Sequence, residues 1–167
     1  MRTCGVEISG NEIFLCLLSK DVDVFDIRDI RQTRFSLPQN GQDTEVMRKF
    51  YFDFKKLVED YKIDSICIKE RPAKGKFAGS ATGFKFEATL QLIPNVDVRI
   101  LSGTEIKEQL KRNPIPIEFS ETGLKKYQEN AFAHAYVYIM RKTFKVDEKL
   151  EAERLEAQKR EARKDVE

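Results

Sequence analysis

The segment CGVEISGNEIFLCLL, residues 4–18, decides how the fold begins, because two apolar runs flank a short polar turn. Ser9-Gly10-Asn11 are residue types typical of a tight reversal, so the stretch from Thr3 to Leu18 predicts a β-hairpin. A weaker strand is predicted from about Gln32 to Leu37. We therefore expect the chain to open with three antiparallel strands.

Helices and strands are then expected to alternate. Phe50, Phe54 and Leu57 recur on one face of a predicted helix that runs from Asp43 or Thr44 to about Tyr61. The later elements are a strand over 64–69, a loop over 71–83, a helix over 84–93, a strand over 96–101, and helices over 104–112 and 121–142. This order predicts an α/β domain over 1–144, with a mixed five-stranded sheet (three antiparallel strands, then two parallel) flanked by helices. A charged helical or disordered extension is expected over 145–167.

Composition narrows the class of protein. The 167 residues are 41% hydrophobic, with only 8 Gly and 5 Pro, which is typical of a folded domain. No apolar run approaches the roughly 18 residues of a membrane-spanning helix, and no secretory signal is visible. Cys4, Cys16 and Cys67 lie in apolar runs and match no metal-binding spacing, so we expect reduced thiols and a cytoplasmic protein.

Three glutamates stand where carboxylates are unusual. Glu7 lies inside the first strand, near Gly5, which allows close approach of other groups; Glu70 follows strand 64–69. Glu129 lies on the last predicted helix, on the face expected to dock on the sheet. Converging carboxylates can hold two Mg²⁺ or Mn²⁺ ions about 4 Å apart for phosphodiester hydrolysis. Glu7, Glu70 and Glu129 are therefore our candidate catalytic and metal-ligating residues.

Each candidate also has a structural interpretation. Glu7 can face solvent from an antiparallel strand, Glu70 can be a solvated loop acid, and Glu129 can lie at the boundary between helix and water. His134, the single histidine, follows Asn130 by one turn. Ordinary packing is the simpler explanation of His134, and a general-base or substrate-contact role is the auxiliary one.

A basic loop follows Lys69, reading KERPAKGKFAGSATGFK over residues 69–85. It interleaves basic residues with two phenylalanines and three glycines, a composition that suits a phosphate backbone and base stacking. The candidate nucleic-acid contacts are Arg71, Lys74, Lys76 and Lys85. A mobile surface loop is the alternative.

Four segments resemble an uncharacterised family of small bacterial proteins, domain of unknown function 3010: CGVEISGNE, IKERPAKGKFAGSATGFKFEATLQLI, TEIKEQLKRNPIP and GLKKYQENAFAHAY. More distantly, the layout is similar to the RNase H-like superfamily, particularly RuvC-type Holliday-junction resolvases. In that group an acid in the first strand, an acid at the end of the fourth strand and acids on a final helix bind Mg²⁺. Glu7, Glu70 and Glu129 occupy the matching places.

The resemblance implies an RNase H-like domain and a Mg²⁺-dependent nuclease that acts on structured nucleic acid. No association with a membrane is expected. RuvC-type relatives are dimers, so it also implies a possible homodimer. Two departures matter: Glu7 stands where resolvases have Asp, and Phe132 or Ala133 stands near the place of a second helix acid. A non-catalytic nucleic-acid-binding or protein-interaction module on the same fold is therefore the alternative.

Overall fold

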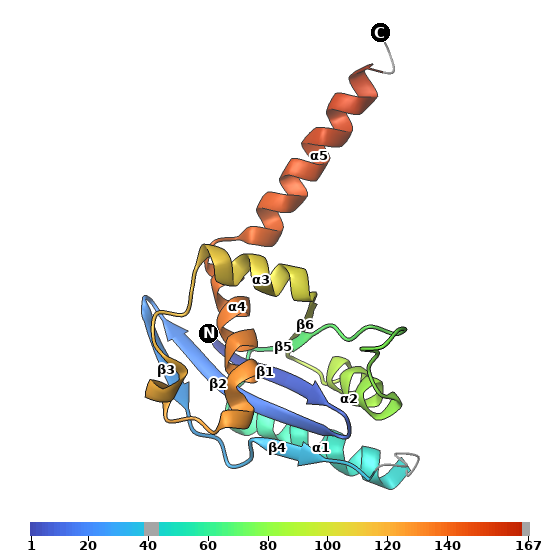
Figure 1. The fold of residues 1–167 in the computed structure, drawn as a ribbon, viewed down its shortest axis with the longest axis vertical. Helices are drawn as coiled ribbons and strands as arrows, with labels where there is room; N and C mark the ends of the chain where they lie inside the picture. Colours follow the sequence, from blue (N-terminus) through green and yellow to red (C-terminus); the bar gives the residue numbers. More distant parts are fainter. Residues whose placement is uncertain (39–43, 165–167) are drawn as a thin grey trace.

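A central sheet organises the computed structural model, which describes residues 1–38 and 44–164 (Figure 1). The strands are β1 (Arg2–Ser9), β2 (Glu12–Asp21), β3 (Val24–Arg28), β4 (Arg34–Ser36), β5 (Ser65–Lys69) and β6 (Asp97–Leu101). The helices are α1 (Thr44–Asp60), α2 (Ala81–Gln91), α3 (Gly103–Arg112), α4 (Glu129–Thr143) and α5 (Val146–Lys164). Asp43, one of the two predicted starts of α1, lies outside the described residues.

The strand order is β3-β2-β1-β5-β6, with β4 also paired to β2. β1 runs antiparallel to β2 and parallel to β5, and β5 runs parallel to β6. The mixed α/β sheet is confirmed, but in the described residues it has six strands instead of five, because β3 was not predicted. β3 is an edge strand in which exposed polar residues, Asp26 and Arg28, alternate with the half-buried Phe25 and Ile27. This alternation leaves no continuous apolar run that would predict a strand.

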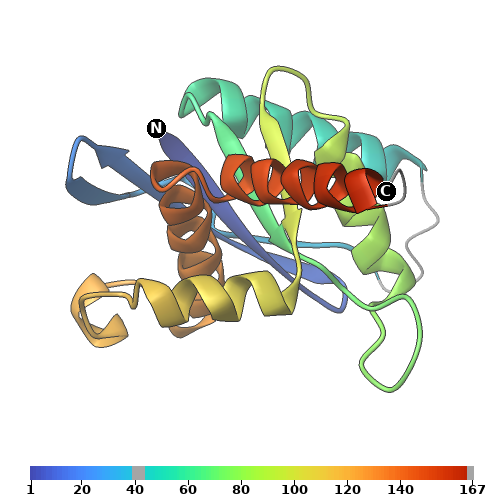
Figure 2. The same cartoon turned by 90° about the horizontal axis from the view of Figure 1, so that it is seen from above.

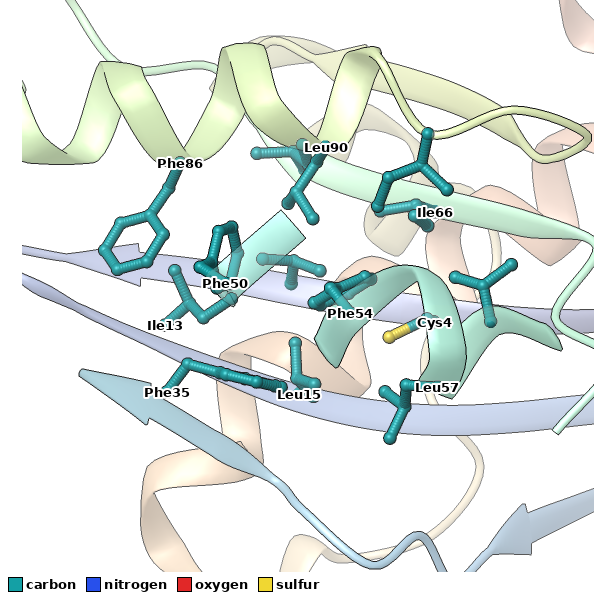
Figure 3. Packing of buried hydrophobic residues seen from close by; sticks show 14 of the residues in the cluster. Cys4, Ile13, Leu15, Phe35, Phe50, Phe54, Leu57, Ile66, Phe86 and Leu90 are labelled. Carbon is teal, nitrogen blue, oxygen red and sulfur yellow. The ribbon is translucent and has the colours of Figure 1, made fainter. Parts of the chain in front are cut away.

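Helices cover both faces of the sheet (Figure 2). On one face, Cys4, Ile13 and Ile66 from the strands pack against α1 and α2, as Figure 3 shows. Aromatic rings fill this core: Phe50 lies edge-on to Phe86, with ring centroids 4.9 Å apart. The apolar spacing that predicted α1 therefore corresponds to a buried helix face.

The other face is covered by α3 and α4, and α4 crosses β1 at Gly5. A Cβ at residue 5 would overlap the carbonyl oxygen of Ala131 and would lie 2.8 Å from the backbone nitrogen of Ala135. Only glycine allows this approach. Gly5 therefore determines how closely the side chains of α4 come to β1.

The last predicted helix begins later than expected. Two short 3₁₀ turns, Phe119–Thr122 and Lys126–Gln128, replace its first two turns, and Gly123 between them has a left-handed φ of 72°. The α-helix itself starts at Glu129. Positive φ at Lys145 (50°) then separates α4 from α5, which projects away from the sheet (Figure 1). Within the described ranges, no helix combines the length and the apolarity that crossing a bilayer requires.

Candidate functional site

A cleft of about 780 Å³ opens at the sheet edge where β1 and β5 end. Four segments line the cleft: the end of β1, the start of the loop that follows β5, one side of α3, and the first turns of α4. Because β1, β5 and β6 are parallel, their carboxyl ends meet at this edge, which is where α/β sheets commonly bind ligands.

Glu7 lines the cleft from β1 and is partly buried. Its Oε1 atom accepts a hydrogen bond of 2.8 Å from the side-chain amide of Asn130. Gly5 precedes Glu7 by two residues on the same face of the strand, and the close approach that it permits brings Asn130 within reach. α4 is thus the element that Gly5 allows to approach Glu7.

Glu70 is the first residue after β5, and its backbone nitrogen donates to the carbonyl oxygen of Leu101 at 2.7 Å. This bond continues the pairing with β6 and holds Glu70 at the cleft, where its side chain is exposed. Burial raises the pKa of Glu87 on α2, and the nearby charge of Glu70 adds to that rise. The carboxylate of Glu70 therefore lies close enough to act on Glu87 of α2 as well as lining the cleft.

Glu129 does not line the cleft that contains Glu7 and Glu70. Since α4 begins at Glu129, this residue lies in the first turn, where its carboxylate pairs with Lys126 of the preceding 3₁₀ turn. The prediction placed Glu129 on the face of this helix that docks on the sheet, from the helical spacing of the apolar residues that follow it, such as Phe132 and Tyr136. Asn130, the next residue, takes the position beside Glu7 instead.

His134 is 5% exposed and lines the cleft one turn after Asn130. Its Nδ1 lies 2.9 Å from the carbonyl oxygen of Val6. A carbonyl oxygen can only accept, so Nδ1 carries the proton and Nε2 is the basic nitrogen of the neutral ring. Burial, with a smaller contribution from the charge of Lys69, lowers the pKa of His134 to about 4.

The basic loop is tied to the β1–β2 hairpin at both ends. The Arg71 guanidinium donates to the carbonyl oxygen of Ile8, and the Ser80 hydroxyl donates to that of Gly10 at 2.9 Å. Phe77, between these anchors, is 79% exposed and lines the cleft, with the ammonium of Lys76 lying 5.8 Å from its ring centroid. The loop thus presents an aromatic side chain at the cleft mouth.

The predicted phosphate contacts are divided between the cleft and its surroundings. Arg71 lines the cleft, whereas Lys74, Lys76 and Lys85 are exposed residues that do not line it. Lys69 and Lys107 line the cleft as well and complete a set of three cations.

Asn130 is the site residue that sequence reasoning missed. Its four-residue spacing from His134, which places both on one helix face, was the available signal.

The cleft offers a restricted set of metal ligands. Glu7 and Glu70 are carboxylates, Asn130 has an amide oxygen, and His134 has an unprotonated Nε2. Among the residues that the structure describes, no group of three or more His, Cys, Asp and Glu is positioned to hold a metal ion. Such a site can bind anions through its cations and can accept protons at His134.

Two solved structures have the same fold. The structure of Thermus thermophilus RuvC has a TM-score of 0.67 and 10% sequence identity, covering 86% of this chain and 96% of that chain. T. thermophilus RuvC in complex with Holliday junction substrate has a TM-score of 0.65 and 9% identity, with the same two coverages. At these identities the likeness shows the fold alone, which is RNase H-like.

No curated protein matches the sequence. A family described as "Protein of unknown function (DUF3010)" matches residues 1–138. That match covers most of the chain, including every residue that lines the cleft. The chain therefore belongs to the DUF3010 family.

Proposed function

We propose that this protein is a divalent-metal-dependent nuclease that acts on structured nucleic acid, and that the cleft is its active site. One observation carries the proposal: Glu7 and Glu70, from neighbouring parallel strands, line the same cleft as Asn130 and His134. The carboxyl ends of parallel strands are where such sheets commonly bind ligands, and carboxylates there can hold the metal ions that assist phosphodiester hydrolysis. The RuvC-like fold and a neighbour bound to a Holliday junction support the choice of substrate.

The donor set fits one hard divalent cation, Mg²⁺ or Mn²⁺, better than two. Glu7 and Glu70 would hold it, with the amide oxygen of Asn130 as a further oxygen ligand. Two carboxylates are too few to hold a pair of ions in the usual way. When bound, the cation would polarise the scissile phosphate and acidify a water molecule.

The cations of the cleft would bind and orient the phosphate backbone. Lys69 is the last residue of β5, Arg71 lies in the loop that follows it, and Lys107 lies on α3; all three line the cleft with the carboxylates. Lys74 and Lys76 would extend this positive surface outward from the mouth. Phe77 is exposed and placed for stacking on an unpaired base, a contact that a branched or single-stranded substrate offers.

His134 would accept a proton from the attacking water. Its Nδ1–H donates to Val6, which leaves Nε2 as the acceptor and holds the ring in a single orientation. Since the pKa of His134 is about 4, the ring is neutral at physiological pH. A base with so low a pKa is weak. His134 would therefore position the water molecule as well as accept its proton.

A non-catalytic nucleic-acid-binding module is the second candidate. The hydrogen bond from Asn130 to Glu7 favours it, because an amide already occupies one carboxylate oxygen. The cations and Phe77 would then bind nucleic acid without cleavage. In that case binding would fall steeply with salt and would persist in EDTA.

The two candidates are separated by cleavage and binding assays on four-way-junction, single-stranded and duplex substrates, with Mg²⁺, Mn²⁺ or EDTA. Glu7→Gln and Glu70→Gln each remove one carboxylate with little change in size. Glu108→Gln is the matched control, because Glu108 is exposed on α3 and does not line the cleft. Glu129→Gln tests the three-acid site that the sequence predicted.

We expect metal-dependent cleavage by the unchanged protein, by Glu108→Gln and by Glu129→Gln, with a loss of at least roughly 100-fold in Glu7→Gln and Glu70→Gln. Calorimetry should show one bound Mn²⁺, which either cleft substitution abolishes. Salt-sensitive binding without cleavage under any metal condition would instead establish the binding module. Loss of cleavage in Glu129→Gln would instead support the three-acid site that the sequence predicted.

A further inference from the structure

α5 leaves the body of the protein as a long exposed helix (Figure 1). Its 19 residues extend about 28 Å. Of the part that the structure describes, only Val146 is buried. Leu150 and Leu155 are 51% and 47% exposed, so about half of each apolar side chain faces water. The helix follows the segment matched by the family, residues 1–138.

The charges of α5 are divided into two blocks of opposite sign. The first part, residues 146–156, has five acids and two bases, a net charge of −3. The second part, residues 157–164, has four bases and one acid, a net charge of +3. We call these parts the acidic half and the basic half.

Contacts within one chain leave most of these charges uncompensated. In the first turn of α5, Asp147 pairs with Arg141 at 2.6 Å. Farther along the described part of α5, the one ion pair is that of Arg160 with Glu156, at 3.7 Å. Lys159 and Arg163 are like charges four residues apart, a spacing that destabilises an isolated helix.

The helix macrodipole explains only part of the pattern. It favours acids in the first turn and bases in the last turn, and its effect falls off beyond them. Glu151, Glu153 and Lys159 lie in the interior of the helix, yet they follow the same division by sign. An external partner with the opposite order of charges would complement both halves.

We propose that α5 pairs antiparallel with α5 of a second copy of this chain. The midpoint of Val146–Lys164 is Leu155, so full overlap places Leu155 against its counterpart. Each acidic half then faces the basic half of the other helix; Glu151, for example, meets Lys159. A parallel pair would instead bring acids against acids, so the charges specify the antiparallel orientation.

The interface is small and electrostatic. Glu148, Leu155 and Ala162 are spaced by seven residues and share one face, and Leu155 is the one large apolar residue among them. The dimer should therefore be reversible and sensitive to salt, because exposed ion pairs weaken as the Debye length falls. It does not depend on the proposed nuclease activity, since α5 contributes no residue to the cleft.

Sedimentation velocity of the full chain tests the pairing. We expect a dimer at about 0.05 M salt that dissociates to monomer at about 0.5 M salt. A variant with Lys159→Glu and Arg163→Glu should dimerise at least roughly tenfold more weakly, as should one with Glu148→Lys and Glu151→Lys. A mixture of the two variants should recover a dimer, because one helix is then acidic and the other basic. Circular dichroism verifies that each variant keeps its helices.

Engineered cysteines test the orientation. In the antiparallel pair, residue 148 of one copy lies beside residue 162 of the other, and the two 148 positions are about 21 Å apart. A mixture of Glu148→Cys and Ala162→Cys proteins should therefore form a mixed disulfide, whereas each protein alone should not. The native Cys4, Cys16 and Cys67 are buried and should not interfere.

Three results would overturn the proposal. The first is a monomer at low salt and high protein concentration. The second is a dimer whose affinity is unchanged by both pairs of charge reversals, which would locate the interface elsewhere. The third is a loss of nucleic-acid binding on reversal of the basic half, with oligomeric state unchanged, because the basic half would then bind nucleic acid.

Discussion

Acid should destabilise this protein through His134, whose buried ring is neutral in the folded state. The pKa of His134 is lowered from 6.5 to about 4, chiefly by burial, and its Nδ1–H donates to Val6. An unfolded chain has an exposed imidazole with a pKa near 6.5. Below that pH the unfolded state binds a proton that the folded state does not, so folding stability decreases as the pH falls.

The size of the effect follows from the two pKa values. Stability is fully present above pH 6.5 and is lost progressively as the pH falls toward 4. At about 1.4 kcal/mol for each pH unit, the loss reaches about 2 kcal/mol by pH 5 and about 3 kcal/mol by pH 4. This is a large fraction of the stability of a typical domain.

Urea unfolding from about pH 7.5 to about pH 5 measures the loss, with His134→Gln as the matched variant. Glutamine does not titrate, and its amide can donate to the Val6 carbonyl oxygen. All other titrating groups are common to both proteins, so the difference between their unfolding free energies isolates the imidazole. Over this pH range, the unchanged protein should lose about 2 kcal/mol more of its unfolding free energy than His134→Gln.

A direct titration provides a second check. The chain has 1 His, so its imidazole signals in an NMR spectrum need no assignment by mutation. The ring in the folded protein should remain neutral at about pH 5.5, where a free imidazole is mostly charged. Parallel stability curves for the two proteins, or a midpoint near 6.5 in the folded state, would refute the reasoning.

Substitutions at three further positions test how the helices are held in place. Gly5→Ala should cost about 3 kcal/mol of unfolding free energy, because its Cβ would overlap the carbonyl oxygen of Ala131; an unchanged urea midpoint would contradict this packing. Asp147→Asn should cost about 2 kcal/mol by thermal unfolding, because it leaves the 6% exposed Arg141 without its shortest ion pair, and Asp147→Glu should be milder. Ser102→Ala removes the N-cap of α3 and should cost about 1 kcal/mol, whereas Ser102→Asp should restore the cap; equal stability of both variants would exclude a capping role.

Local patterns were sufficient to predict much of the fold. The turn residues after Ile8 predicted the β1–β2 hairpin, and the spacing of Phe50, Phe54 and Leu57 predicted the buried face of α1. β3 escaped notice because a half-exposed edge strand has no continuous apolar run. Patterns of this kind depend on residues close in sequence, and so they are readable without the tertiary structure.

Within the candidate site, the sequence alone indicated Glu7, because it is a carboxylate inside an apolar strand, and Glu70, because it stands at the carboxyl end of a strand. Only the tertiary structure decided which residue of α4 reaches Glu7. Successive residues of a helix are turned by about 100°, and with Ala131 packed on Gly5 the first turns of α4 present Asn130 and His134 to the cleft, whereas Glu129 pairs with Lys126. Long-range packing between α4 and β1 sets that rotation, and the depressed pKa of His134 follows from the same burial.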